Sequence, residues 1–263
     1  TRSTIFNCGG LFRYYEQTFQ CLNKNAHGGE NVETALRDSC NIFFYNCAKR
    51  LGITKMNEYA SAFGLGQKTG VEIAESAGTL AGPEEREAAG GVWQSGDTIQ
   101  AGIGQSDNLF TPLQLSNYCA TVANGGTRYQ LHLVQSLIDN SSGTVTETQP
   151  KIEESLDLHK STLTAVKSGM RLVATQGAPS LIFNQLRTEV AAKTGTSQVF
   201  VNGVKKNNGF LITFAPYDNP EISVASVVEL AGSGTSTAEI TSSIIKYWYQ
   251  NNTDEKTNQN TGA

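Results

Sequence analysis

The sequence predicts an α/β protein of the α+β kind, in which an antiparallel β-sheet is covered by helices. Three candidate strands, 189–201, 209–215 and 221–231, follow one another late in the chain. Their connections have hairpin length, which favours antiparallel pairing. Helical patterns precede and follow the strands, and this order indicates one sheet with helices packed against it. We expect one domain over residues 1–250 and a disordered polar tail over residues 251–263.

The other elements follow from caps, breakers and hydrophobic periodicity. Glycine pairs divide residues 1–30 into loops and short strands. The pattern from Asn31 to Leu51 is helical with an interruption near Asp38 and Ser39; Asn31 can cap this helix and Gly52 can end it. The remaining expected elements are a short helix over 54–63, irregular chain over 70–110, a helix from Thr111 to Ala123, a strand pair over 131–150, and helices over 161–175 and 236–249.

Composition excludes several classes of protein. Of the 263 residues, 38% are hydrophobic and 17% are charged, which suffices for a core and excludes a wholly disordered chain. A net charge of −4 argues against nucleic-acid binding. No apolar run approaches the roughly 18 residues of a membrane helix. The chain begins with Thr1 and shows no signal-peptide pattern, so we expect a piece of a longer protein.

The strongest chemical signal is a run of four residues in the first late strand: Lys193, Thr194, Gly195 and Thr196. Because side chains alternate along a strand, Lys193 and Gly195 share one face and the two threonines share the other. A glycine inside a strand usually marks close approach by a ligand or another backbone. Two hydroxyls and an ammonium can hold a substrate carboxylate, and the strand edge can pair with an extended peptide.

A second signal, Ser39-Cys40-Asn41, begins the buried helix. Ser39 would bring a hydroxyl that can relay protons, and Asn41 an amide that can bond to a carbonyl. Each motif alone also has a plain interpretation, because Ser39 can cap a helix and Lys193 can be a solvated strand lysine.

In combination, these motifs resemble the Lys-Thr-Gly and Ser-x-Asn sets of penicillin-binding proteins and serine β-lactamases, whose third set is a Ser-x-x-Lys nucleophile. Further stretches are similar to the transpeptidase domain of the class B, elongation-type penicillin-binding proteins. The similarity covers nearly the whole chain to about residue 250 and keeps the motif order. The matching stretches are 39–45, 66–73, 96–98, 102–105, 111–115, 123–126, 193–200 and 214–217.

Two other motif matches are rejected. Lys68-Thr69-Gly70 repeats the third motif, but it lies in a predicted loop only 29 residues after Ser39. Ser243-Ile244-Ile245-Lys246 spells the nucleophile motif, but it lies in the final predicted helix, after Lys193. In the family the nucleophile precedes Ser-x-Asn, so we expect it upstream of Thr1. Without it, this chain alone is predicted to be inactive.

The resemblance implies a peptidoglycan D,D-transpeptidase at the extracytoplasmic face of the bacterial plasma membrane, with an anchor outside this chain. The serine would attack the penultimate D-Ala carbonyl of a stem peptide, and an amine of a neighbouring stem would capture the acyl-enzyme. β-Lactams would enter the same site. Stem peptides and β-lactams are therefore the expected partners, and membrane proteins of the elongation machinery could contact missing regions.

The resemblance also implies roles for individual residues. Ser39 would relay protons, Asn41 would hold the substrate amide and Lys193 would add positive potential. Thr194, Gly195 and Thr196 would bind the substrate, with both hydroxyls on its terminal carboxylate and the Thr196 N–H on the oxyanion. The alternatives left open are a D,D-carboxypeptidase or β-lactamase-like enzyme, in which water is the acceptor, and a non-catalytic penicillin-binding scaffold or sensor.

Cys8, Cys21, His27 and Cys40 form a candidate metal site within residues 1–40. Three thiolates and one imidazole are a complete tetrahedral zinc set, although no pair has the tight two-residue spacing of zinc ribbons. A Cys8–Cys21 disulfide and free thiols are the alternatives. Some elongation-type family members are similar here and bind zinc, which implies a structural zinc next to the active site; Gly9 replaces their usual proline.

The remaining cysteines and histidines receive plain interpretations. Cys47 and Cys119 lie on apolar helix faces and are predicted to be small core residues. His132 and His159 lack partners with metal spacing and receive no role.

Overall fold

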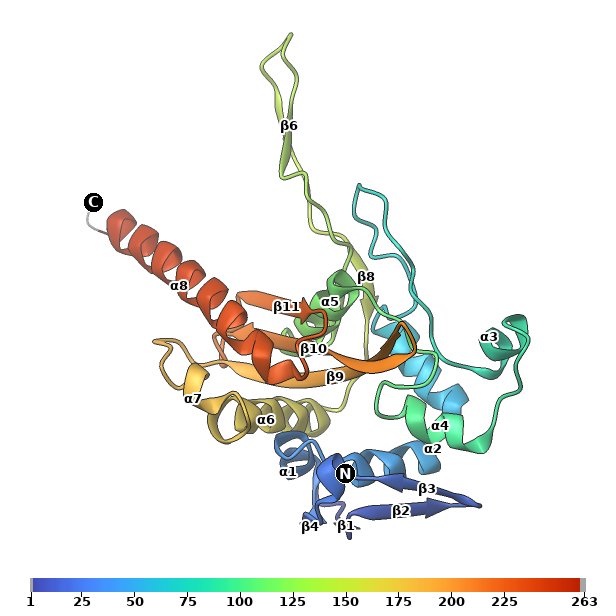
Figure 1. Ribbon diagram of the computed structural model, residues 1–263. Coiled ribbons are helices and arrows are strands. Elements are labelled where there is room, and N and C mark those ends of the chain that lie inside the picture. The colour runs from blue at the N-terminus through green and yellow to red at the C-terminus, as the bar shows by residue number, and fades with distance from the viewer. Residues whose placement is uncertain (1, 261–263) are drawn as a thin grey trace. The chain divides into compact units, whose positions relative to one another are not determined.

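The computed structural model describes residues 2–260 and has the predicted α+β fold (Figure 1). The chain divides into two compact units. The first comprises residues 1–46 and 160–263, and the second comprises residues 47–159. Within the described residues, no helix is long and apolar enough to cross a membrane.

An antiparallel three-stranded sheet is the centre of the first unit. Its strands are β9 (Ala191–Val201), β10 (Val204–Ala215) and β11 (Ile222–Val228), in the order β11-β10-β9. The predicted hairpins therefore form, and β9, which carries the Lys-Thr-Gly-Thr run, is an edge strand of this sheet. In the register of β9 and β10, Lys193 lies opposite Ile212 and Gly195 lies opposite Phe210.

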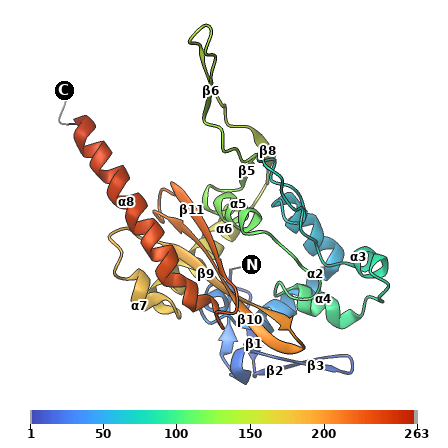
Figure 2. The same cartoon turned by 45° about the horizontal axis from the view of Figure 1, so that its top comes forward.

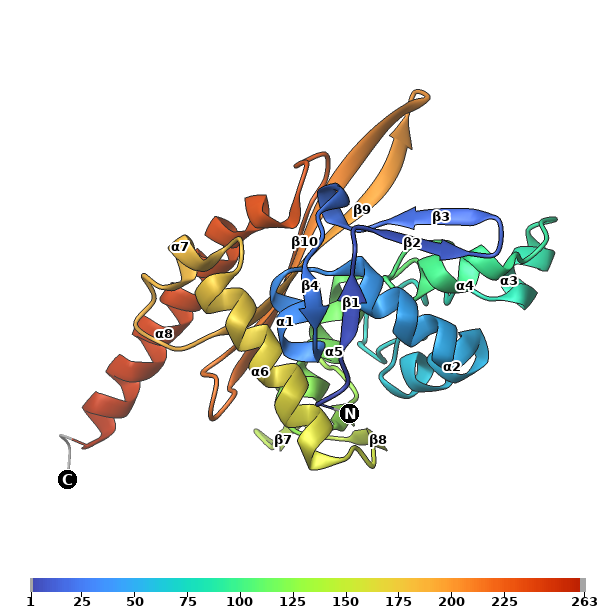
Figure 3. The same ribbon diagram turned by 90° about the horizontal axis from the view of Figure 1, so that it is seen from below.

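Helices α6 (Lys160–Gln176) and α8 (Ala238–Asn260) contact opposite faces of this sheet (Figure 3). The ammonium of Lys167 on α6 lies 5.4 Å from the ring centroid of Phe214. Thr241 on α8 is hydrogen-bonded to Ser226 on β11. Together with α7 (Ser180–Phe183), these helices close the core. Its buried members are Val173, Ala174, Phe183, Val190, Ala192, Leu211, Ala215, Val224, Ala238 and Ile245.

The N-terminal part of the first unit consists of two short strand pairs and one short helix, and the short strands agree with the prediction from the glycine breakers. Strand β1 (Phe6–Cys8) pairs with β4 (Gly28–Glu30), and β2 (Leu11–Tyr14) pairs with β3 (Gln17–Gln20). A single 3₁₀ turn, η1 (Leu22–Lys24), joins them. The β2–β3 hairpin packs aromatic rings against Tyr45, with Phe12 and Phe19 at 5.6 and 5.5 Å between centroids.

Helix α1 (Val32–Arg37) begins at the predicted cap. The Asn31 side chain accepts hydrogen bonds from the backbone N–H groups of Glu33 and Thr34, which completes a capping box. Helix α2 (Asn41–Ala62) is interrupted at Gly52, whose φ of 73° is left-handed, so the two helices expected on either side of this glycine are present.

The second unit contains the long irregular stretch and several short elements. Besides the greater part of α2, its helices are α3 (Pro83–Ala88), α4 (Ser95–Ala101) and α5 (Pro112–Ala123). Its strand pairs are β5 (Thr127–Tyr129) with β8 (Ile152–Ser155) and β6 (Ser136–Ile138) with β7 (Val145–Glu147), the latter forming a projecting hairpin (Figure 2). Arg86 ties the irregular stretch together through ion pairs with Asp97 and Asp107.

The C-terminal helix differs from the prediction. Helix α8 continues past Tyr249, where the hydrophobic pattern ends, to Asn260. Continuation needs no apolar face, because each added residue closes one more backbone hydrogen bond. The disorder expected over 251–263 stays a prediction, and residues 261–263 lie outside the described range.

A short segment crosses the sheet beside Gly195. The 3₁₀ helix η2 (Gly234–Thr237) precedes α8, and Gly234 lies directly against the backbone of β9 and β10. A Cβ added at Gly234 would stand 2.8 Å from the backbone N of Gly195 and closer still to the carbonyl oxygens of Gly195 and Phe210. The close approach predicted from the strand glycine is therefore made by another backbone.

Gly234→Ala should force this segment away from β9. We expect a loss of about 1–3 kcal/mol in the free energy of unfolding, because the overpacked atoms are backbone and cannot rotate aside. Urea denaturation measures this loss. Gly29→Ala is the control, since its Cβ would meet only Ile5 at an ordinary 3.5 Å. Equal stability of the two variants would contradict the packing described here.

Candidate functional site

Ser39 and Lys193, 154 residues apart, are in direct contact. The Lys193 Nζ donates a hydrogen bond to the Ser39 Oγ at 2.7 Å and a second one to the Thr194 carbonyl at 2.8 Å. The turn between α1 and α2 is thus joined to strand β9. The sequence motifs predict this juxtaposition, while the catalytic roles of both residues stay predictions.

Ser39 adopts an unusual backbone conformation. Its φ is 50°, in the left-handed region that costs a residue with a side chain about 1–2 kcal/mol. The end of α1 imposes this geometry: the Cys40 N–H donates to the Ala35 carbonyl at 2.9 Å, and the Ser39 N–H to Leu36 at 3.4 Å. Strain of this kind concentrates at functional sites. The plain interpretation of Ser39 as a helix cap does not describe this turn.

Lys193 has a perturbed acidity. Desolvation lowers the pKa of its side chain from 10.5 to about 8. Burial disfavours the charged ammonium, which donates to two neutral oxygens, the Ser39 hydroxyl and the Thr194 carbonyl. A lysine with this pKa holds both protonation states in useful amounts near neutral pH, which suits proton transfer as well as anion binding.

Asn41 is held by the hairpin that precedes the helices. Its Nδ2 donates to the Gln20 carbonyl at 3.3 Å, and the Tyr45 hydroxyl donates to the same oxygen at 3.3 Å. Gln20 immediately precedes Cys21. The amide proposed for substrate binding is therefore oriented by the segment that also carries a candidate metal ligand. The sequence contains no signal for this contact, because it depends on how the hairpin packs.

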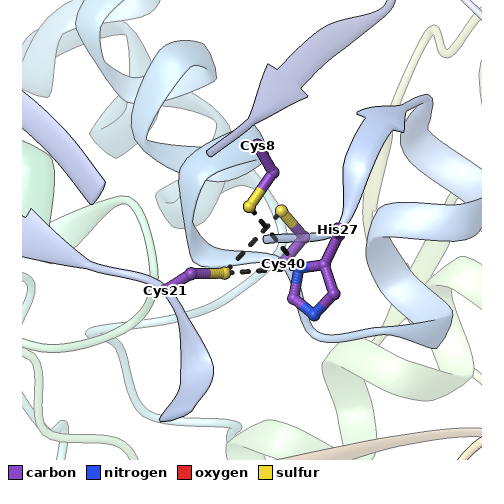
Figure 4. A group of neighbouring side chains, drawn as sticks. All are labelled: Cys8, Cys21, His27 and Cys40. Carbon is purple, nitrogen blue, oxygen red and sulfur yellow. Dashed lines mark hydrogen bonds between the residues drawn. The ribbon is translucent and has the colours of Figure 1, made fainter. Parts of the chain in front are cut away.

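The four predicted metal ligands converge on one point (Figure 4). Their ligand atoms all lie within 4.8 Å of one another. Cys8 and Cys21 place their sulfurs 3.6 and 3.4 Å from the Nδ1 of His27, and the sulfurs of Cys21 and Cys40 are 3.9 Å apart. Bond lengths of about 2.3 Å to sulfur and 2.0 Å to nitrogen give tetrahedral ligand separations of about 3.5–3.8 Å. The residues therefore fit a zinc ion.

Each ligand stands at the boundary of a secondary-structure element. Cys8 ends β1, Cys21 follows β3 and His27 precedes β4, while Cys40 precedes α2. The three cysteines are buried, and none of the five cysteines in the chain forms a disulfide. Although burial raises the pKa of the Cys8 thiol, hydrogen bonds involving the backbone of His27 and Gly10 bring it down to about 7. A thiol of this acidity readily supplies the thiolate that metal binding requires.

Sequence reasoning missed a set of charged groups beside Ser39. Arg37 forms a two-point ion pair with Asp38, from Nε at 2.7 Å and Nη2 at 2.8 Å, and hydrogen bonding to Arg37 lowers the pKa of Asp38. Glu30 is only 2% exposed, and burial raises its pKa. The adjacency of Arg37 and Asp38 in the sequence could have indicated their ion pair. Nothing in the sequence indicates the burial of Glu30, because an acidic residue at a strand end is ordinarily solvated.

The rejected motif matches have ordinary structural roles. Thr69 donates to Glu75 from its backbone N–H and from its hydroxyl, outside any strand. Ser243 donates to the Glu239 carbonyl one turn earlier in α8, and Ile245 is fully buried. Cys119 is buried as predicted and Cys47 is partly buried.

Comparison with known proteins identifies the family. The family model described as the penicillin-binding protein transpeptidase domain matches residues 1–246. The chain is 31% identical over 259 residues to peptidoglycan D,D-transpeptidase MrdA of Escherichia coli K12, covering 91% of this chain and 40% of that protein. It is 32% identical over 230 residues to penicillin-binding protein 2A of Bacillus subtilis 168, covering 76% and 31%. The chain thus spans less than half the length of these curated relatives.

Solved structures agree with the sequence comparison. The structure of Pseudomonas aeruginosa PBP2 in complex with WCK 5153 matches with a TM-score of 0.83 at 26% identity, over 94% of this chain and 56% of that one. Helicobacter pylori PBP2, in a complex with MreC, matches with a TM-score of 0.82 at 24% identity, over 95% and 46%, and so supports the fold. The chain belongs to the penicillin-binding protein transpeptidase family, and its relatives are of class B.

Proposed function

We propose that this chain supplies the substrate-binding part of a peptidoglycan D,D-transpeptidase, an enzyme that cross-links the cell wall and is acylated by β-lactams. The single observation that carries the proposal is the hydrogen bond between Lys193 and Ser39 beside the edge strand β9. It places a lysine of lowered pKa, a hydroxyl and an unpaired strand edge in one place, as acyl transfer from a peptide requires.

The reaction begins with a serine outside residues 1–263, because the family order places the nucleophile before Ser39. Its oxygen attacks the carbonyl of the penultimate D-Ala, an ester forms, and the terminal D-Ala leaves with a proton on its amine. The amine of a second stem peptide then displaces the serine and forms the cross-link. Ser39 and Lys193 pass protons to and from the reacting atoms, since their contact at 2.7 Å and the lowered pKa of Lys193 allow exchange.

Strand β9 binds the donor. Thr194 and Thr196 hold its terminal carboxylate, and Asn41, held by the Gln20 carbonyl, hydrogen-bonds to its amide. The backbone N–H of Thr196 donates to the oxyanion, an interaction worth roughly 3–4 kcal/mol in other acyl-transfer enzymes. The backbone of Gly195 lies directly against Gly234.

We further propose that Cys8, Cys21, His27 and Cys40 hold one structural zinc ion. The separations of their ligand atoms support this. Four protein ligands leave no open position, so the ion would cross-link the weakly structured first 40 residues rather than take part in the chemistry. Cys40 would then fix the backbone between Ser39 and Asn41.

The location and partners of the whole protein follow from the same assignment. We infer an extracytoplasmic site of action, with the anchor outside residues 1–263, because stem peptides are found there. The MreC complex of Helicobacter pylori PBP2 supports contacts with elongation-machinery proteins. Regions beyond this chain would make those contacts.

Fluorescent penicillin distinguishes the enzyme from a non-catalytic scaffold. Residues 1–263 alone should not be labelled, whereas a version extended upstream to include a Ser-x-x-Lys sequence should be. In the extended form, Lys193→Ala should slow labelling about 100-fold or more, because a proton-transfer group is lost. Lys68→Ala, in the rejected Lys-Thr-Gly copy, is the matched control and should label normally. An extended form that does not label would support the scaffold.

Metal analysis checks the zinc proposal. After dialysis we expect one zinc per chain, and Cys21→Ser should lose the metal and melt at a lower temperature, because a ligand bound only to the folded state is lost. Cys47→Ser, outside the cluster, should keep its zinc. A substoichiometric zinc content in the unaltered chain would refute the assignment.

The acidity of Lys193 gives a pH dependence of defined sign. Its pKa is about 8 when folded and 10.5 ordinarily, so the unfolded chain binds more protons between these values. The free energy of unfolding should therefore rise with pH from about 8 to 10.5 through this group. The ammonium needed for anion binding is lost over the same rise. Lysine-selective ¹³C NMR should show one signal titrating near pH 8 that is absent in Lys193→Arg; titration of every lysine above pH 10 would be incompatible with the desolvated site.

A further inference from the structure

The hairpin of β9 and β10 continues well beyond the Lys-Thr-Gly-Thr run (Figure 3). Strand β11 pairs with β10 only from Gly209 to Ala215. Residues 197–208 therefore form a two-stranded extension, which is more than the binding of a terminal D-Ala-D-Ala needs. A two-stranded ribbon alone is at best marginally stable in water, so its length calls for a function.

One face of this extension continues the face of β9 that carries Thr194 and Thr196. From Thr196 to Phe200 the exposed residues of β9 are Thr196, Gln198 and Phe200, and they alternate with half-buried Ser197 and Val199. By the strand period of two, the exposed set shares the face of Thr194 and Thr196. Phe200 is 75% exposed.

The partner strand adds a cation to the same face. Lys205 lies directly opposite Phe200 in the antiparallel register, so both side chains project from one side of the hairpin. Lys206, opposite Val199, projects from the other side. The exposed face thus carries threonine hydroxyls at its inner end and an aromatic ring with an ammonium at its tip.

The opposite end of β9 is closed. Val190, Ala191 and Ala192 are at most 1% exposed. A peptide whose C-terminal carboxylate lies at Thr196 therefore cannot continue toward them. It can continue only along the free edge toward the hairpin tip, which makes it antiparallel to β9 and brings its N-terminal part to Phe200.

We propose that Phe200 and Lys205 form a binding subsite for the part of the donor peptide that precedes D-Ala-D-Ala, and that this subsite selects donors with an acidic group there. The inference rests on the proposed transpeptidase function and names the substrate class of the same site. From Thr196 to Phe200 the strand advances about 13 Å, so the recognised group lies about four residues before the terminal D-Ala.

The spacing across the sheet is compatible with this pairing. A peptide on the free edge of β9 lies about 10 Å, two strand spacings, from β10. A lysine side chain and an acidic side chain reaching toward each other over Phe200 together span that distance. The ring supplies apolar surface under the lysine stem and the peptide backbone.

The test uses the upstream-extended enzyme and two synthetic donors that end in D-Ala-D-Ala. One donor carries a free carboxylate at the fifth residue from its C-terminus, and the other carries the corresponding amide. Lys205→Ala should raise KM for the acidic donor about two- to fivefold, the effect of one exposed ion pair, with kcat unchanged. The amide donor should show no such change, and added salt should reduce the difference.

Lys206→Ala is the matched control, because it removes the same charge from the adjacent position on the other face. It should leave KM for both donors unaltered. Phe200→Ala should raise KM for both donors, because the apolar contact does not depend on the charge. Equal effects of Lys205→Ala and Lys206→Ala, or an effect of Lys205→Ala that is the same for both donors, would overturn the proposed subsite.

Penicillin labelling separates this inference from the function on which it rests. A β-lactam has no stem peptide, so Lys205→Ala should be labelled at the unaltered rate. Normal labelling combined with unchanged KM values for the acidic donor would refute the subsite alone. If the unaltered extended enzyme failed to label, the transpeptidase function itself would be contradicted.

Discussion

The hydrogen bond from Lys193 to Ser39 is the constraint on which the rest of the site depends. It joins the edge of a sheet to a turn between two helices that are far away in the sequence. Burial desolvates the lysine and lowers its pKa to about 8. A fully solvated lysine would keep its ordinary pKa of 10.5 and would stay almost entirely protonated near neutral pH.

The Ser39 turn is strained, and its surroundings hold it from several directions. The end of α1 fixes the backbone before it, the Arg37–Asp38 ion pair flanks it, and Asn41 after it is bonded to the Gln20 carbonyl. Cys40 joins the turn to the cysteine–histidine cluster. A left-handed serine persists only when neighbouring contacts outweigh its cost of about 1–2 kcal/mol. The cluster therefore has a structural reason to lie beside the site.

Local patterns in the sequence predict the helices, the strands and the motif residues. They do not predict the contacts that backbone atoms make between distant segments. The Asn31 cap, the Gly52 break and the three late strands each have a signal within a few residues. The crossing of Gly234 over Gly195 and the shared carbonyl of Gln20 have none, because they arise when distant segments pack. The meeting of Ser39 and Lys193 was predictable only through family resemblance, since neither tripeptide alone specifies a partner.

Strand β9 is buried at one end and exposed at the other, and the local sequence pattern does not show where the change occurs. Its first residues, Ala191 and Ala192, are buried in the core, and its last residues form an exposed ribbon with β10. Lys193 to Thr196 lie at the transition between them. A strand anchored at one end and open at the other holds a peptide carboxylate rigidly while leaving the rest of the peptide a free edge to follow. The position of the motif within the strand, rather than its composition alone, would account for the proposed binding of an extended substrate by its C-terminal end.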